Sequence, residues 1–381
     1  MRDVDAAGLG IGDDYPPRIM GVLNVSAESP YEPSVFDDPG AAAAYVDAEL
    51  IDEGADVVDV GLESANKRFE VLSAEEELDR LDTAVAAMQS VSGDAVFSIE
   101  TRYHEVAQAA LDAGFDMVND ICGFADPEMP RVCAERDVAV VKMASPPDLT
   151  RPGAVEHVDD IYAALEREGL TDKTIVDPAF GGWSEAKTLA DDRETFDRLR
   201  EFRALDRPIL VSINRKNFLR DIAGRSTEEA LPVSLAATAM AVERGAHVIR
   251  THDVQETRDA ALVGDAFTRD RLRTTTGDVT VEELDVTSVG EMERHLTRVG
   301  GDADAARQGT TRVFELAGLT PGDCDALVDA ARGTTALVAG TGDRRLLAGT
   351  PADLATVVRA ASGRSDGLDA ALSAVESVAN R

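Results

Sequence analysis

Short apolar runs rich in β-branched residues recur along the first two thirds of the chain, each followed by a polar or glycine-containing loop and an amphipathic helical stretch. The runs begin near Ile19, Val57, Val96, Met117, Val138, Thr174, Ile209 and His247. Helical stretches between the runs include residues 39–53, 73–90, 104–113, 156–168, 191–203 and 227–244. Eight strand–helix units in about 250 residues predict an α/β fold, a closed (β/α)8 TIM barrel.

An open, doubly wound sheet is the alternative arrangement of alternating strands and helices. Such a sheet often carries a glycine-rich dinucleotide-binding motif after its first strand. The loop that follows the run at residues 19–25 has no such motif. The pattern therefore favours the barrel.

The pattern changes after about residue 270. Apolar runs at residues 335–339 and 345–348 flank a glycine-containing turn and predict a β-hairpin. Helical stretches cover residues 291–298, 304–316, 321–331, 351–361 and 367–379. We therefore predict a loose acidic N-terminal arm over residues 1–17, a barrel over 18–268 and a small C-terminal α/β appendage of unassigned role over 269–381.

The chain is strongly acidic, with 72 Asp and Glu against 38 Lys and Arg and a formal net charge of −34. The acidic residues are spread over the whole length, which we interpret as a halophilic surface adapted to high salt. This charge repels nucleic acid and anionic membranes, so neither is an expected partner. At molar salt the Debye length falls to about 3 Å, so distant carboxylates hardly oppose an anionic ligand bound among local cations.

The three cysteines, Cys122, Cys133 and Cys324, are too few and too irregularly spaced for a disulfide framework or a tetrahedral metal site. Residues 1–17 lack the basic start and apolar centre of a secretory signal. No run approaches the about 20 apolar residues that a membrane span needs. We expect a cytoplasmic protein.

Polar side chains stand at the end of every predicted strand. Lysine is scarce in this chain, yet Lys216 follows Arg215 directly after the apolar run at 208–213. The other strand ends carry Asn24, Asp59, Glu63, Glu100, Asn119, Asp120, Lys142, Met143, Asp177, Asn214, Arg250 and His252. Catalytic groups of a (β/α)8 barrel gather at the C-terminal ends of its strands. We therefore expect these side chains to converge on one face, where the cations would bind negative charge.

Six motifs together resemble dihydropteroate synthase, in that family's order. They are IMGVLNV at residues 19–25, GADVVDVG at 54–61, VNDI at 118–121, DPAFG at 177–181, NRKNFL at 214–219 and RTHD at 250–253. The resemblance covers residues 18–267 and itself implies a (β/α)8 barrel. It implies a transferase of folate biosynthesis that condenses 6-hydroxymethyl-7,8-dihydropterin pyrophosphate with p-aminobenzoate and releases pyrophosphate. It also implies Mg²⁺ as the cofactor and a homodimer.

The resemblance places the pterin ring on five side chains, carried over motif by motif. They are Glu100, Asn119, Met143, Asp177 and Lys216. A carboxylate at Asp177 that faces the guanidine-like edge of the ring would form a bidentate, charge-assisted contact.

The resemblance places the leaving diphosphate among Asn24, Arg250 and His252. Mg²⁺ would bridge Asn24 and the phosphates, since this ion uses one or two protein oxygens and completes its shell with phosphate and water. Lys216, Arg250 and His252 are the predicted catalytic residues, because positioned donors stabilise the charge that develops on a leaving group.

The chain departs from the family pattern at several positions. The loops at residues 25–31 and 63–68 differ from the family loops that help to hold p-aminobenzoate. Glu100 replaces an aspartate that contacts the pterin, and its extra methylene moves the carboxylate by about 1.5 Å. The stretch 179–184 and Asn214 also differ.

Two other functions are consistent with these residues. A pterin-dependent methyltransferase uses similar Asn and Asp side chains, and a non-catalytic pterin-binding or regulatory homologue would lack the second substrate's site. Arg215, Lys216, Arg250 and His252 favour the synthase, because a methyltransferase has no diphosphate to neutralise.

Overall fold

The computed structural model describes residues 1–381 except 26–33, 64–70, 154, 182–185, 277–278 and 380–381. The chain divides into two compact units, Met1–Asp270 and Arg271–Arg381. The boundary predicted from the sequence pattern lies between residues 268 and 269. All predicted site residues belong to the first unit.

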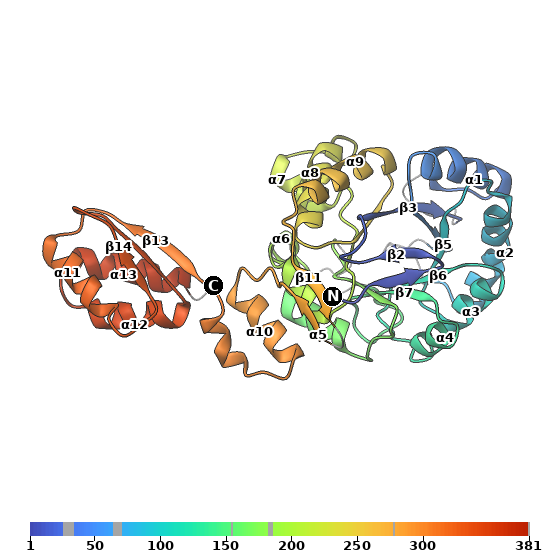
Figure 1. Ribbon diagram of the computed structural model, residues 1–381. Coiled ribbons are helices and arrows are strands. Elements are labelled where there is room, and N and C mark those ends of the chain that lie inside the picture. Colours follow the sequence, from blue (N-terminus) through green and yellow to red (C-terminus); the bar gives the residue numbers. More distant parts are fainter. Residues whose placement is uncertain (26–33, 64–70, 154, 182–185, 277–278, 380–381) are drawn as a thin grey trace. The chain divides into compact units, whose positions relative to one another are not determined.

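The first unit is a (β/α)8 barrel, as predicted (Figure 1). Its parallel strands lie in the order β8-β7-β6-β5-β4-β3-β10-β9. They are β3 (Arg18–Asn24), β4 (Val57–Gly61), β5 (Val96–Thr101), β6 (Met117–Asp120), β7 (Ala139–Met143), β8 (Thr174–Asp177), β9 (Leu210–Val211) and β10 (Val248–Thr251). A parallel bridge between Val176 and Ile209 closes the ring between β8 and β9.

Helices surround this ring of strands (Figure 1). They are α1 (Pro39–Tyr45), α2 (Ala74–Ser90), α3 (His104–Asp112), α4 (Met129–Glu135), α5 (Val158–Glu166), α6 (Leu189–Asp197), α7 (Asn217–Ala223), α8 (Leu231–Glu243) and α9 (Val254–Ala266). Ser73 and Glu76 form a capping box that starts α2. The strands are buried on both sides, by the barrel interior and by the helices, which explains their unbroken apolar runs.

The N-terminal residues form a packed hairpin, so the prediction of a loose arm was wrong. Strands β1 (Val4–Ala6) and β2 (Leu9–Ile11) pair antiparallel. Val4, Ala6 and Ile11 are buried in one cluster with side chains from the first residues of the barrel strands. The hairpin therefore covers the N-terminal end of the barrel, where Arg18 Nε also donates to the carbonyl of Gly10 at 2.9 Å.

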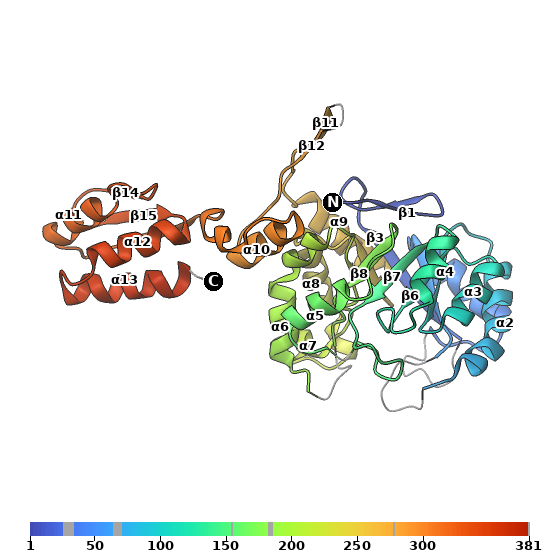
Figure 2. The ribbon, with the colours of Figure 1, turned by 90° about the horizontal axis from the view of Figure 1, so that it is seen from below.

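The second unit contains a three-stranded antiparallel sheet in the order β13-β15-β14 and helices that pack on it. Its core elements are β13 (Arg312–Leu316), α11 (Pro321–Ala330), β14 (Leu337–Ala339), β15 (Arg345–Gly349), α12 (Pro351–Ala361) and α13 (Asp366–Ala379). Before them come the hairpin of β11 (Arg273–Thr276) and β12 (Val279–Glu282), helix α10 (Val289–Arg298) and the 3-10 segment η5 (Ala303–Gln308). Figure 2 shows α12 and α13 side by side.

The predicted hairpin of this unit is confirmed by the pairing of β14 with β15. The helix predicted over residues 304–316 is wrong, because η5 ends at Gln308 and β13 follows. In β13, Val313 and Glu315 are exposed and Leu316 is buried, which is closer to the two-residue period of a strand. In the part of the chain that the structure describes, every helix is too short or too polar to cross a lipid bilayer.

The N-terminal hairpin should stabilise the barrel measurably. Ile11 is fully buried, so Ile11→Ala should lower the free energy of unfolding by roughly 2–5 kcal/mol through lost burial and a residual cavity. Denaturant unfolding in molar KCl measures this change. Ile222→Ala is the matched control, since Ile222 is 64% exposed and its loss should cost less than about 0.5 kcal/mol. Equal effects of the two substitutions would show that the hairpin is not part of the core.

Candidate active site

The register of the barrel aligns four site positions across neighbouring strands. Asn24 of β3 lies opposite Gly61 of β4, Gly61 opposite Glu100 of β5, and Glu100 opposite Asn119 of β6. A Cβ atom at Gly61 would lie 3.1 Å from Asn24 Oδ1 and 3.9 Å from Glu100 Oε1. Glycine therefore leaves the space in which these two side chains converge. Asn24 Nδ2 donates to Ser34 Oγ at 2.9 Å, which fixes the orientation of the carboxamide.

Arg250 of β10 forms hydrogen bonds with Glu100 of this row and with Asp59 of β4. Its Nε donates to Asp59 Oδ2 at 2.7 Å, and its Nη2 donates to Glu100 Oε2 at 2.6 Å. Asn119 Nδ2 donates to the same Asp59 oxygen at 2.9 Å. Burial alone would lower the pKa of Arg250, but Glu100 and Asp59 outweigh it and raise the pKa. The guanidinium therefore stays charged.

Burial also raises the pKa of Glu100, an effect that the nearby Arg250 guanidinium partly offsets. The longer side chain of glutamate here forms the ion pair with Arg250. The departure from the family's aspartate is thus accommodated by this pair.

Asp177 and Lys216 form a second charged pair at the same end of the barrel. Asp177 ends β8, and its Oδ1 accepts the N–H of Ala179 at 2.7 Å. Burial raises the pKa of Asp177 to about 6, while Lys216 and Arg250 act to lower it. Burial lowers the pKa of Lys216, against the effect of Asp177. Gly181 has a φ of +113°, and a Cβ there would lie 3.1 Å from the Nζ of Lys216, so this position favours glycine.

His252 is not a cation, although the sequence suggested that it would be one. Burial lowers its pKa to about 3, and the neighbouring Arg250 charge acts in the same direction. The imidazole is therefore neutral at neutral pH, and it can contribute hydrogen bonds but no charge.

The structure brings the predicted site residues to the C-terminal end of the barrel. They are Asn24, Glu100, Asn119, Met143, Asp177, Lys216, Arg250 and His252. Met143 ends β7 opposite Asp177 of β8. Two partly desolvated cations, two carboxylates and two carboxamides thus surround one region. Such a set can bind a flat heterocycle that both donates and accepts hydrogen bonds, together with an anionic group.

The sequence profile of the pterin binding enzyme family matches residues 20–252. The chain belongs to the pterin binding enzyme family. It is 34% identical over 268 residues to a probable bifunctional folylpolyglutamate synthase/dihydropteroate synthase of Haloferax volcanii, a match that covers 66% of this chain and 31% of the relative. A similar bifunctional relative from Halobacterium salinarum is 36% identical, over 65% of this chain and 31% of its own length. The chain thus spans about a third of these two relatives.

Two further relatives are covered over most of their length. The dihydropteroate synthase of Bacillus subtilis is 30% identical, over 65% of this chain and 88% of the relative. The solved dihydropteroate synthase of Coxiella burnetii, in complex with pteroic acid, is 28% identical with a TM-score of 0.59, covering 70% of this chain and 98% of that protein. These matches confirm the resemblance drawn from the six motifs.

Arg215 is not a ligand-binding cation, contrary to the expectation from its place beside Lys216. Its Nε and Nη2 pair with the two carboxylate oxygens of Asp253, both at 2.8 Å. Its Nη1 donates to the carbonyls of Thr227 and Glu228 at 2.8 and 2.9 Å. Arg215 therefore links the loop after β9 to the segments that contain Asp253 and Thr227.

Lys142 also points away from the other site residues. Its ammonium donates to the carbonyls of Leu165 and Gly169 at 3.0 and 3.1 Å and to the carbonyl of Arg167. These carbonyls lie at and just after the C-terminus of α5, where a cation is favourable. The position of Lys142 near a strand end did not reveal that its side chain faces the helix layer.

Lys187 is a residue that the sequence reasoning missed. Its side chain is 1% exposed, pairs with Asp192 at 3.3 Å and donates to the carbonyl of Ala179 at 2.8 Å. Its charge lowers the pKa values of Asp177 and Lys216. The signal was the scarcity of lysine, combined with the place of Lys187 shortly after DPAFG at residues 177–181.

Parts of the predicted second-substrate site fall outside the described residues. These are residues 26–31 of the first loop, 64–68 of the second and 182–184 of the stretch after β8. At the edge of the second loop, Glu63 pairs with the buried Arg102 at 2.9 Å. Arg102 in turn donates to the carbonyl of Leu149 at 2.8 Å.

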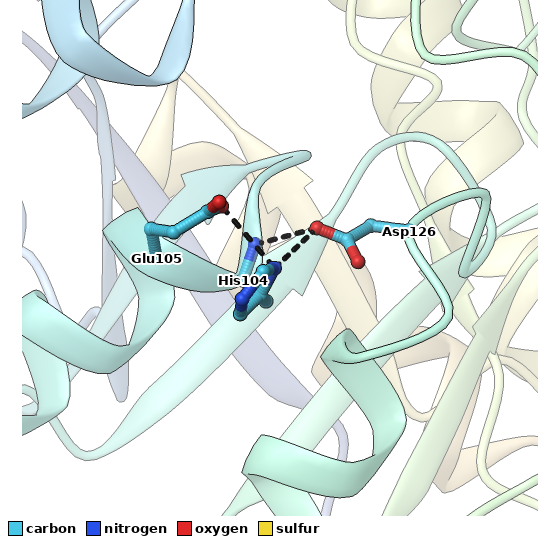
Figure 3. A group of neighbouring side chains, drawn as sticks. All are labelled: His104, Glu105 and Asp126. Carbon is cyan, nitrogen blue, oxygen red and sulfur yellow. Dashed lines mark hydrogen bonds and ion pairs between the residues drawn. The ribbon is translucent and has the colours of Figure 1, made fainter.

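His104, Glu105 and Asp126 form a separate cluster at the start of α3 (Figure 3). His104 Nδ1 lies 2.8 Å from Asp126 Oδ2 and 3.2 Å from Glu105 Oε2. Asp126 Oδ2 also accepts the backbone N–H of His104 at 3.0 Å. Asp126 thereby satisfies an N–H of the first turn of α3, so we assign the cluster a structural role, as predicted for His104.

Glu77 of α2 should make stability depend on pH. It is buried, accepts a hydrogen bond from Thr101 Oγ1 at 2.5 Å, and has a pKa that burial raises to about 8. Between its ordinary pKa and pH 8 the folded protein binds more protons than the unfolded chain, so this group makes stability fall as the pH rises. Glu77→Gln should remove that part of the fall. Thermal unfolding at pH 5, 7 and 9 measures it, with the exposed Glu75→Gln as the control. Parallel curves for wild type and Glu77→Gln would contradict the expectation.

Proposed function

We propose that this chain is a dihydropteroate synthase, which condenses 6-hydroxymethyl-7,8-dihydropterin pyrophosphate with p-aminobenzoate to give 7,8-dihydropteroate and pyrophosphate. The carrying observation is the convergence of Arg250, Asn119 and Glu100, joined by hydrogen bonds, with Asp177 and Lys216. Solved relatives named dihydropteroate synthase contain pteroic acid or 4-aminobenzoate, which supports the same pair of substrate classes.

The geometry accounts for the roles in this reaction. The bond from the pterin methylene carbon to the diphosphate oxygen breaks, and the arylamine nitrogen then forms a bond to that carbon and loses a proton to water. Negative charge then grows on the diphosphate, where the cations of Arg250 and Lys216 would stabilise it. His252, which is neutral at pH values near 7, would donate a hydrogen bond to the diphosphate. Asp177 would hold the guanidine-like edge of the pterin.

We propose Mg²⁺ as the cofactor, held by Asn24. The carboxamide oxygen of Asn24 and a carboxylate oxygen of Glu100 converge beside Gly61, and oxygen donors of this kind suit Mg²⁺. The ion would neutralise part of the charge of the diphosphate. We also propose that the chain works at high salt, because its full length carries a net charge of −34, while the site cation Arg250 is paired with Asp59 and Glu100.

Release of pyrophosphate tests the function directly. The purified chain, supplied with dihydropterin pyrophosphate, p-aminobenzoate and Mg²⁺ in molar KCl, should release pyrophosphate only when both organic substrates are present. Binding of the pterin without release would favour the non-catalytic homologue. Absence of binding would remove the proposal altogether.

Loss of either cation should impair turnover. Lys216→Ala or Arg250→Ala should lower kcat by roughly tenfold or more, because each removes stabilisation of the developing diphosphate charge. The same pyrophosphate assay measures it. Lys173→Ala and Arg131→Ala, at positions remote from the site, are the controls. Wild-type rates in the first two variants would exclude those residues from the mechanism.

Asp177→Asn should weaken pterin binding itself, because it removes the charged acceptor for the ring. Calorimetry with 6-hydroxymethyl-7,8-dihydropterin measures the affinity. Asp137→Asn is the control, since the side chain of Asp137 is 84% exposed. An unchanged affinity would assign Asp177 a structural role.

A further inference from the structure

We propose that Asp59 is a positioning residue that holds the pterin end and the diphosphate end of the site in one arrangement. This inference rests on the proposed function, because it takes Asn119 as a pterin ligand and Arg250 as a diphosphate ligand. Asp59 touches both of these side chains, and it was assigned no role by the motifs that identified them.

The topology explains how Asp59 joins Arg250 and Asn119. Asp59 lies in the middle of β4, whereas Arg250 is on β10 and Asn119 on β6, each two strands away in opposite directions around the ring. Backbone pairing links only neighbouring strands. A side chain that points into the barrel can reach both, and Asp59 Oδ2 accepts from Arg250 Nε at 2.7 Å and from Asn119 Nδ2 at 2.9 Å.

Burial strengthens the hydrogen bonds that Asp59 accepts from Arg250 and Asn119. The side chain of Asp59 is fully buried and that of Arg250 is 19% exposed. In such surroundings a charge-assisted hydrogen bond is less screened than at the surface, and loss of one partner leaves the other unpaired. Rotation of the Arg250 or Asn119 side chain would therefore break its hydrogen bond to Asp59, and water can hardly replace that bond at a buried position.

The two carboxylates on Arg250 occupy different nitrogens. Asp59 binds Nε, at the base of the guanidinium, and Glu100 binds Nη2, at its tip. The bond from Nε to Asp59 can persist while the Nη nitrogens donate to phosphate oxygens. Asp59 therefore sets the direction of the guanidinium, and Asn119 is aligned by the same oxygen atom.

The test measures each half of the substrate separately. Calorimetry in molar KCl follows the binding of 6-hydroxymethyl-7,8-dihydropterin and of inorganic pyrophosphate with Mg²⁺ to wild type, Asp59→Ala and Asp59→Asn. Asp59→Ala should weaken both affinities at least fivefold, and Asp59→Asn should recover part of each loss because it keeps an oxygen acceptor. Asn119→Ala should weaken only the pterin and Arg250→Ala only pyrophosphate.

Coupling distinguishes positioning from a general loss of stability. Pyrophosphate affinity in the double variant Asp59→Ala/Arg250→Ala should equal that of Arg250→Ala, since Asp59 acts on pyrophosphate through Arg250. Asp13→Ala is the matched control. Asp13 pairs with Arg203 at 2.9 Å and contacts His247, which precedes the first residue of β10, so its loss should affect stability and neither affinity.

The outcomes separate the inference from the proposed function. Wild type that binds neither ligand would overturn both. Wild type that binds both, with unchanged affinities in Asp59→Ala, would overturn the inference alone. Tighter pyrophosphate binding in Asp59→Ala would also overturn it, because Asp59 would then merely weaken the charge of Arg250.

Discussion

A largely buried guanidinium is the constraint around which the mouth of this barrel is arranged. The charge of Arg250 is tolerable there only because carboxylates reach it from two other strands, and both carboxylates are held in place by the barrel register. The Asp59 oxygen that pairs with Arg250 also accepts from Asn119, so the group that pairs the cation also orders a polar side chain of the site. The strand pairing that closes the barrel therefore also orders the polar side chains of the site.

The sequence predicted the strands well because each is sandwiched between the interior and the helices and so must be apolar throughout. It predicted the strand-end residues because parallel strands bring their carboxyl ends to one side. It could not predict the N-terminal hairpin, whose three-residue strands lie among acidic residues such as Asp3 and Asp5. The pairing of Arg215 with Asp253 was hidden for another reason, because 38 positions separate them in the chain.

Most lysines of this chain have buried side chains, whereas many of its more numerous arginines lie at the surface. Lys142 and Lys187 have buried side chains, and Lys216 is desolvated beside Asp177, so most of this chain's few lysines serve interior contacts. Arginines such as Arg131 and Arg198 instead pair with carboxylates on the surface. Scarcity therefore made lysine informative, and Lys187 shows that a lysine outside the recognised motifs can lie near the site. Arginine, being common, gave no comparable signal.

Strand β9 is only two residues long, which limits how firmly it is held in the ring. Its neighbours in the ring are held to it by few ladder bonds, one of them the single bridge from Val176 to Ile209. Local opening of a sheet costs least where its ladder is shortest. This sparsely paired part of the ring precedes Lys216 in the chain, and local opening there would displace the Lys216 ammonium from Asp177. The cation beside Asp177 therefore follows the strand with the shortest backbone pairings in the ring, whereas Glu100 and Asn119 lie on strands with longer ladders.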